Sequence, residues 1–213
     1  MPRLSYPRKR PVIRWARGLF FALGIVLLGF VGFSMVDAKL FQAYENWRLN
    51  QALKNARPSS ALAQPQAVTT PLSPHDEIPH GAVAPGAILG RIEISRIGVS
   101  VMIAEGTEQR TLRRAVGHIT GTAFPGEQGN VALAGHRDTF FRALHNIRQD
   151  DEVTLTTLTG SYSYRVDSMK VVAPEDTEVL NNSGESMLTL VTCYPFYFVG
   201  PAPKRFIVRA HRT

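Results

Sequence analysis

The segment 188-LTLVTCYPFYFVGPAPKRFIVRA-210 holds two stretches of alternating residues on either side of a connection rich in proline and glycine. Leu188 and Leu190 alternate with other residues in the first stretch, and Phe206 and Val208 do so in the second. Successive side chains of a β-strand point to opposite faces, so a period of two predicts a strand with one face toward a core. The segment therefore predicts two β-strands joined by a long loop.

The same alternation recurs along the chain from Ile88 onward. Turns that contain proline or glycine separate the alternating stretches, which is typical of a β-sandwich or a β-barrel. Short helices are expected within residues 107–116 and 139–147. The predicted core-facing residues of the earlier strands are Ile92, Ile94, Val99, Val101, Ile103, Val131, Leu133, Val153, Leu155, Tyr162, Tyr164 and Val166.

The N-terminal part of the chain has a different composition. The stretch 19-LFFALGIVLLGFVGFSMV-36 carries no charge, and only basic residues are charged before it. About 18 helical residues reach roughly 27 Å, enough to cross the hydrocarbon core of a bilayer. A cleaved signal peptide, with a weak cleavage site at 36-VDA-38, is the alternative, but its apolar region of about 7–15 residues would be shorter. We therefore expect a retained single-pass anchor in the cytoplasmic (inner) membrane, with its basic N-terminus inside and the later residues outside.

Composition divides the chain into five segments. We expect a basic cytoplasmic segment 1–17, a transmembrane helix 18–37, a juxtamembrane helix 38–56, a proline-rich tether 57–87 and a β domain 88–213. The formal net charge is +7, but the N-terminal segment accounts for most of it, and no basic stripe interleaved with aromatic residues follows. We therefore expect no binding to nucleic acid.

Cys193 is the only cysteine of the chain. A single cysteine in an exported protein is a cross-linker between molecules, an inert buried thiol or a reactive nucleophile. Because Leu188 and Leu190 mark the core face of their strand, the alternation places Cys193 on the opposite face. This placement favours the nucleophile.

A thiol nucleophile needs a partner for proton transfer and a donor for the oxyanion that forms on the attacked carbonyl. His136 follows the stretch 130-NVALAG-135, in which Val131 and Leu133 mark the core face, so His136 is expected on the other face. Arg205 is expected on that face as well, because it alternates with Phe206 and Val208. The remaining histidines are expected in the tether (His75 and His80), a turn (His118), a helix (His145) and the C-terminal tail (His211).

Three motifs in this order resemble those of the sortases, the membrane-anchored cysteine transpeptidases of bacteria. The segment 189-TLVTC-193 resembles the strand that ends in their nucleophile, and 133-LAGHR-137 resembles the strand end that carries their histidine. The segment 204-KRFIV-208 resembles their final strand with its arginine. The resemblance covers about residues 86–210 and is greatest to class D. It implies an all-β fold, an eight-stranded β-barrel with short helices.

The resemblance also implies a reaction. Cys193 would attack the Thr–Gly bond of an LPXTG-like sorting signal, and an amine acceptor of the cell envelope would resolve the thioacyl enzyme. His136 is implied as general acid and base, and Arg205 as the residue that holds the substrate and the oxyanion. Thr192 is expected either to bind substrate or to pack in the core, and Asp138 either to orient His136 or to cap a turn. No cofactor and no metal are expected, because the sequence shows no acidic cluster that demands one.

Two other functions stay open at this point. An L,D-type cysteine transpeptidase acting on peptidoglycan would carry a histidine two residues before the cysteine, where this chain has Val191. An anchored binding module without activity would hold an inert thiol. The tether also lacks the Asp-Pro-aromatic lid of pilus-building sortases, because Asp76 is followed by Glu77. We therefore expect an open groove and a housekeeping or dedicated attachment role.

Overall fold

The computed structural model describes residues 10–56, 83–182 and 184–213 of the chain. Most of the predicted tether and the first part of the basic segment lie outside these residues, and with them the prediction that no lid covers the thiol. The chain forms two compact units, one that ends at Leu40 and one that begins at Phe41.

Helix α1 (Arg10–Ala56) covers both the predicted membrane span and the predicted juxtamembrane helix without a break. Its stretch from Arg14 to Asn55 is long and apolar enough to cross a membrane by length and composition. Large apolar side chains of this stretch, such as Leu19, Phe20 and Phe33, are exposed. A helix with apolar side chains all round is typical of a lipid-facing segment. The boundary between span and juxtamembrane helix stays a prediction.

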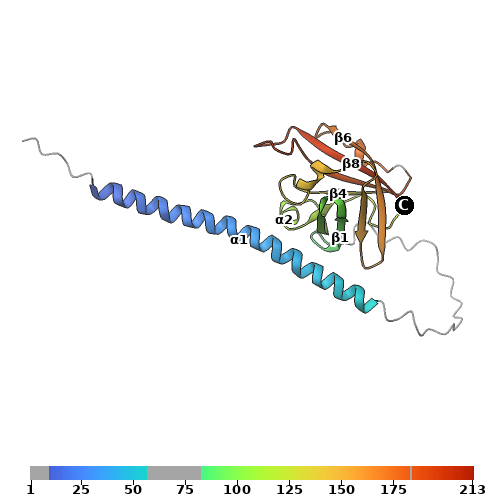
Figure 1. Ribbon diagram of the computed structural model, residues 1–213, viewed down its shortest axis with the longest axis horizontal. Coiled ribbons are helices and arrows are strands. Elements are labelled where there is room, and N and C mark those ends of the chain that lie inside the picture. The colour runs from blue at the N-terminus through green and yellow to red at the C-terminus, as the bar shows by residue number, and fades with distance from the viewer. Residues whose placement is uncertain (1–9, 57–82, 183) are drawn as a thin grey trace, which may run out of the picture. The chain divides into compact units, whose positions relative to one another are not determined.

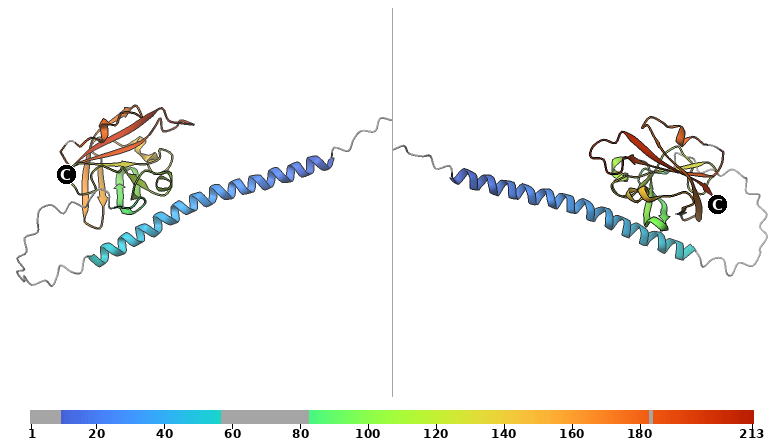
Figure 2. Two further views of the ribbon diagram at one scale, coloured as in Figure 1. Left: turned by 180° about the vertical axis from the view of Figure 1, so that it is seen from behind. Right: turned by 45° about the horizontal axis from the view of Figure 1, so that its top comes forward.

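Eight strands close into a barrel within the second unit (Figure 1). The order of strands around the barrel is β1-β2-β3-β4-β7-β8-β6-β5, and β5 pairs with β1 to close it. The long strands β6 and β8 lie side by side in an antiparallel pair (Figure 2). The strands are β1 (Ile88–Ile94), β2 (Val99–Glu105), β3 (Val116–His118), β4 (Asn130–Ala134), β5 (Glu152–Thr156), β6 (Ser161–Val172), β7 (Met187–Tyr194) and β8 (Lys204–Arg212).

The helices of the barrel unit are short, as predicted, but shorter than the sequence pattern indicated. Within 107–116 only α2 (Gln109–Leu112) is helical, and within 139–147 only the 3-10 helix η3 (Arg142–Asn146) is. Two further 3-10 turns, η2 (Ser95–Ile97) and η4 (Glu178–Leu180), complete the set. The prediction of a turn at His118 is wrong, because this residue ends β3 and pairs with Glu105 of β2 and Leu133 of β4.

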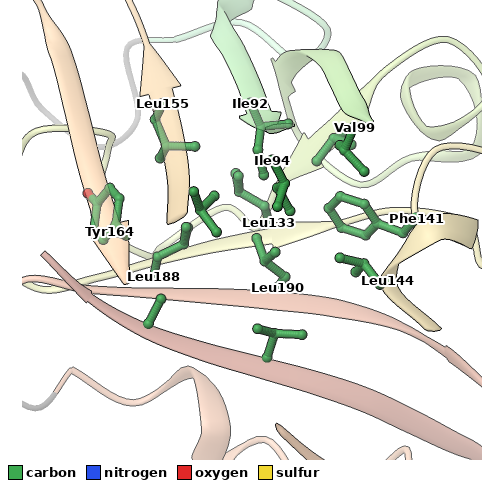
Figure 3. Packing of buried hydrophobic residues seen from close by; sticks show 14 of the residues in the cluster. Ile92, Ile94, Val99, Leu133, Phe141, Leu144, Leu155, Tyr164, Leu188 and Leu190 are labelled. Atoms are coloured by element: carbon green, nitrogen blue, oxygen red, sulfur yellow. The ribbon is translucent and has the colours of Figure 1, made fainter. Parts of the chain in front are cut away.

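The barrel interior is filled by the apolar side chains that the alternation assigned to it. Of the predicted core residues, Tyr162 and Phe206 are partly buried and all the others are buried. Figure 3 shows side chains from β1, β2, β4, β5, β6 and β7 and from the η3 segment meeting in one cluster. The cluster labelled there consists of Ile92, Ile94, Val99, Leu133, Phe141, Leu144, Leu155, Tyr164, Leu188 and Leu190. Tight packing of branched side chains makes this interior a rigid support for the strand ends.

The outer face of β4 and β7 is also covered at the start of the two strands. The Asn130 amide donates a hydrogen bond to the carbonyl of Val179 in η4 at 3.1 Å, and the Thr189 hydroxyl donates to Asn130 Oδ1 at 2.7 Å. Thr189 has no exposed surface. On the same face of β7, Val191 and Cys193 lie farther along the strand and are half-buried.

Candidate active site

The parallel pairing of β4 and β7 sets the position of His136 relative to Cys193. Ala134 is the partner of Val191 in the ladder. The pairing continues one residue further, because the Gly135 amide donates to the Val191 carbonyl at 3.1 Å and the Thr192 hydroxyl donates to the Gly135 carbonyl at 2.7 Å. His136 is the next residue after Gly135, as Cys193 is after Thr192, so the register brings the two side by side.

Arg205 lies on the other side of the thiol. It is the ladder partner of Cys193 in the antiparallel pair of β7 and β8. Directly opposed residues of such a pair project to the same face, with Cβ atoms about 4.5–5.5 Å apart. The Arg205 guanidinium donates to the carbonyls of Ala202 and Lys204 at 3.2 and 3.0 Å. These bonds hold the guanidinium at carbonyls of its own segment, next to the start of β8.

The three side chains are half-buried, and the thiol is free. A nucleophile in such a place is open to a substrate yet shielded on the barrel side. An imidazole can transfer protons, and a guanidinium can donate hydrogen bonds to a negative oxygen. The arrangement suits attack of the thiol on a carbonyl carbon, and its side chains come from β7, β8 and the segment after β4.

Thr192 is buried, with 2% of its surface exposed. Its hydroxyl is engaged by the Gly135 carbonyl, on the core side of β7. This placement favours the packing interpretation of Thr192 over the substrate contact that was its alternative. The hydroxyl therefore adds one hydrogen bond between β7 and the segment after β4.

Asp138 is exposed in the turn after His136. Among the residues that the structure describes, no hydrogen bond joins its carboxylate to the imidazole, so the orienting role for Asp138 gains no support. The turn is closed by backbone bonds, since the amides of Thr139 and Phe141 donate to the His136 carbonyl at 3.4 and 3.1 Å. The backbone of His136 is thereby fixed on its C-terminal side.

His118, the rival histidine, has no exposed surface. Its Nδ1 lies 2.6 Å from Glu105 Oε2, and its Nε2 lies 3.0 Å from the Ala123 carbonyl. The Glu105 carboxylate also accepts a hydrogen bond from the Thr120 hydroxyl at 2.7 Å. This buried cluster is satisfied within itself and lies on β2 and β3, so the imidazole of His118 is not presented to a substrate.

The other histidines are placed as follows. His145 is exposed in η3, and its ring lies 6.0 and 5.9 Å from the rings of Phe196 and Tyr197. His211 lies on β8, where its Nδ1 contacts Asp167 of β6 at 2.5 Å. His75 and His80 lie outside the described residues. Of the histidines that the structure describes, His136 alone is half-buried, and it lies two residues beyond the end of β4.

Known proteins are similar to this chain in sequence and in fold. The family model described as the sortase domain matches residues 92–213. Sortase D of Bacillus subtilis strain 168 is 33% identical, with 90% of this chain and 94% of that protein covered. The solved sortase D5 transpeptidase of Clostridium perfringens is 36% identical with a TM-score of 0.57, covering 62% of this chain and 82% of its own. Sortase C of the same organism, solved with the C-terminal cell wall sorting motif, is 32% identical with a TM-score of 0.57, covering 62% and 74%.

A closed barrel with a half-buried thiol, imidazole and guanidinium at neighbouring strand ends suits cysteine-dependent acyl transfer. The chain belongs to the sortase family, whose members are cysteine transpeptidases. Its similarity to class D members is confirmed by two of these relatives. Family membership also removes the L,D-type transpeptidase and the inactive binding module from the alternatives.

Proposed function

We propose that this sortase cleaves an LPXTG-like sorting signal between Thr and Gly through a thioacyl intermediate on Cys193. The acyl group then passes to an amine of the cell envelope. Helix α1 would anchor the enzyme in the cytoplasmic membrane with its basic N-terminus inside, because an excess of positive charge favours that orientation. The barrel would then act outside the membrane, where both proteins and envelope amines are available to it.

The first half of the reaction forms the thioester. The Cys193 thiolate attacks the carbonyl carbon of the Thr residue, and the carbonyl oxygen becomes an oxyanion that accepts hydrogen bonds from Arg205. The C–N bond to Gly then breaks, and protonated His136 gives its proton to the departing amine. The products are the released fragment, which begins with Gly, and the acyl group bound to the Cys193 sulfur.

The second half reverses these roles. Neutral His136 takes a proton from the incoming amine as its nitrogen attacks the thioester carbon. Arg205 again donates to the oxyanion, and the C–S bond breaks to regenerate the Cys193 thiolate. A new amide bond is formed, so no energy source other than the thioester is required.

The observation that carries this proposal is the register around Cys193. One ladder neighbour of Cys193 is Arg205 on β8, and His136 lies two residues beyond the end of β4, the other strand that pairs with β7. A barrel built for packing alone has no need of a half-buried thiol, imidazole and guanidinium on one face at one strand end.

The experiment is acyl-enzyme trapping with the full chain in detergent. The chain is mixed with a library of LPXTG-type peptides, quenched and weighed by intact mass spectrometry. We expect an adduct on Cys193 that ends at the Thr residue, and none in Cys193→Ala. His136→Ala and Arg205→Ala should each slow adduct formation by at least about a hundredfold. Retained peptide cleavage by Cys193→Ala would rule out covalent thiol catalysis.

A further inference from the structure

Arg137, the residue directly after His136, binds the loop that follows Cys193. Its Nη1 donates to the Pro195 carbonyl at 3.1 Å, and its Nη2 donates to the carbonyls of Phe198 and Gly200 at 2.8 Å each. The guanidinium carbon also lies 5.8 Å from the centre of the Phe198 ring. One side chain thus bridges the two segments that leave the thiol and the imidazole.

The loop between β7 and β8 packs on the core through Phe196, but its tip is exposed. Tyr197, Phe198 and Val199 are exposed by 73%, 45% and 95%. A loop whose apolar side chains point outward gains little from burial. A charged donor forms stronger hydrogen bonds than a neutral one, and here one guanidinium binds three carbonyls of this loop.

The position of these bonds in the sequence gives them a consequence for the reaction. Pro195 follows the thiol by two residues, and Arg137 follows the imidazole by one. The loop also accepts a bond from Arg205 through the Ala202 carbonyl. Any shift of the loop is therefore transmitted to the end of β7 and to the backbone beside the imidazole.

We propose that Arg137 is a positioning residue, which sets the separation of the Cys193 thiol and the His136 imidazole by tying the β7–β8 loop to the segment after β4. The proposal rests on the proposed function of these two groups as nucleophile and acid–base. Proton transfer falls off steeply with misplacement, and an error of about 1 Å at a reacting group costs up to about a hundredfold in rate. Arg137 itself touches no reacting atom.

An arginine suits this task better than a lysine. A guanidinium presents several donors in a planar fork, so it reaches three carbonyls at once, whereas an ammonium is a compact charge on a flexible stem. Arg137→Lys therefore keeps the charge and loses most of the geometry. Arg142→Gln is the matched control, because Arg142 meets the same loop only across the face of the Tyr197 ring, at 5.9 Å.

The test compares wild type, Arg137→Gln, Arg137→Lys and Arg142→Gln as full chains in detergent. Steady-state cleavage is normalised to the number of thiols that form the acyl enzyme. We expect Arg137→Gln to lower kcat per active thiol by about ten- to hundredfold with KM within about twofold. Arg137→Lys should lie between Arg137→Gln and wild type, and Arg142→Gln should stay within threefold of wild type.

A second measurement does not depend on a peptide. The rate of Cys193 alkylation by iodoacetamide against pH reports how well the imidazole stabilises the thiolate. We expect its midpoint to move to higher pH in Arg137→Gln and in Arg137→Lys, and to stay in place in Arg142→Gln. Because the lysine variant keeps the positive charge, its shift reports lost geometry.

Three results would overturn the inference: an unchanged kcat and midpoint in Arg137→Gln, a raised KM at constant kcat, or a lower Tm with unchanged kcat per active thiol. The last would show a purely structural role. Failure of the proposed function gives a different result, namely no acyl adduct on wild-type Cys193 with any peptide. In that case the alkylation midpoints still decide whether Arg137 positions the thiol and the imidazole.

Discussion

Replacement of Thr192 by valine tests how the strands beside the thiol are held together. The two side chains have nearly the same shape, so Thr192→Val removes one hydrogen bond, from the hydroxyl to the Gly135 carbonyl at 2.7 Å. A neutral hydrogen bond contributes about 1 kcal/mol, and a buried carbonyl left without a partner raises the loss to about 3 kcal/mol. For a domain of this size, we expect Tm to fall by roughly 3–12 °C.

Near-UV circular dichroism is suited to this measurement, because both tryptophans, Trp15 and Trp47, lie on α1 and the tyrosines of the barrel report its packing. Peptide cleavage by the same samples gives kcat and KM. We expect kcat to fall a few-fold with KM unchanged, because the lost bond ties the backbone next to His136 to β7. Thr189→Val is the control: it removes a bond of the same length on the same strand, to Asn130, away from the thiol. It should lose comparable stability and keep both kinetic constants.

The opposite pattern would refute this reasoning. If Thr192→Val melts at the wild-type temperature and binds peptide more weakly, the hydroxyl contacts substrate, and the bond to Gly135 is not what the residue is for. Equal loss of kcat in Thr189→Val would show that general destabilisation, not the tie beside the imidazole, lowers the rate.

Three further predictions concern the support of the site. A hydrogen bond from Arg96 holds the pKa of Asp151 below its usual value. The pair therefore stabilises the fold above about pH 4, and this stability is lost as the pH falls through the lower folded-state pKa. The difference in Tm between wild type and Asp151→Asn should shrink below that pH, and a constant difference would contradict the linkage. A Cβ at Gly135 would lie 2.7 Å from a ring carbon of Phe141, so Gly135→Ala should cost about 1–3 kcal/mol in chemical denaturation, and the double variant with Phe141→Leu should lose less than the sum of the two; full additivity would mean that the clash is relieved elsewhere. His145→Gln should keep the cleavage rate within threefold of wild type. A hundredfold loss would identify His145, and not His136, as the acid–base group.

The strand positions and the core were predictable because both depend on local periodicity. Leu188, Leu190 and Val208 are buried, as their alternation required. The predicted side of Cys193 and Arg205 follows from the same period, and their direct pairing agrees with it. The sequence gives no comparable local signal for β3, since Val116–His118 is too short to show a period and is defined by its partners in β2 and β4.

The hydrogen bonds from Arg137 to the β7–β8 loop could not be predicted from composition. The length of the loop after Cys193 and its glycine and prolines indicate an ordered, functional segment. They do not say which side chain orders it, because that depends on carbonyl groups brought together only when the loop is folded. Likewise, alternation with Phe206 and Val208 predicts Ile207 on the outer face with Arg205, yet Ile207 is 1% exposed.

The way β4 pairs with β7 bears on how the chain reaches its folded state. The hydrogen bond between Thr192 and Gly135 joins residues 57 positions apart. Such distant pairings form late and slowly, since a long loop must close before any contact is gained. While the barrel is incomplete, Cys193 is unprotected from oxidants. Cys193 is the only cysteine of the chain. No incorrect disulfide within the chain can therefore form while the barrel folds slowly.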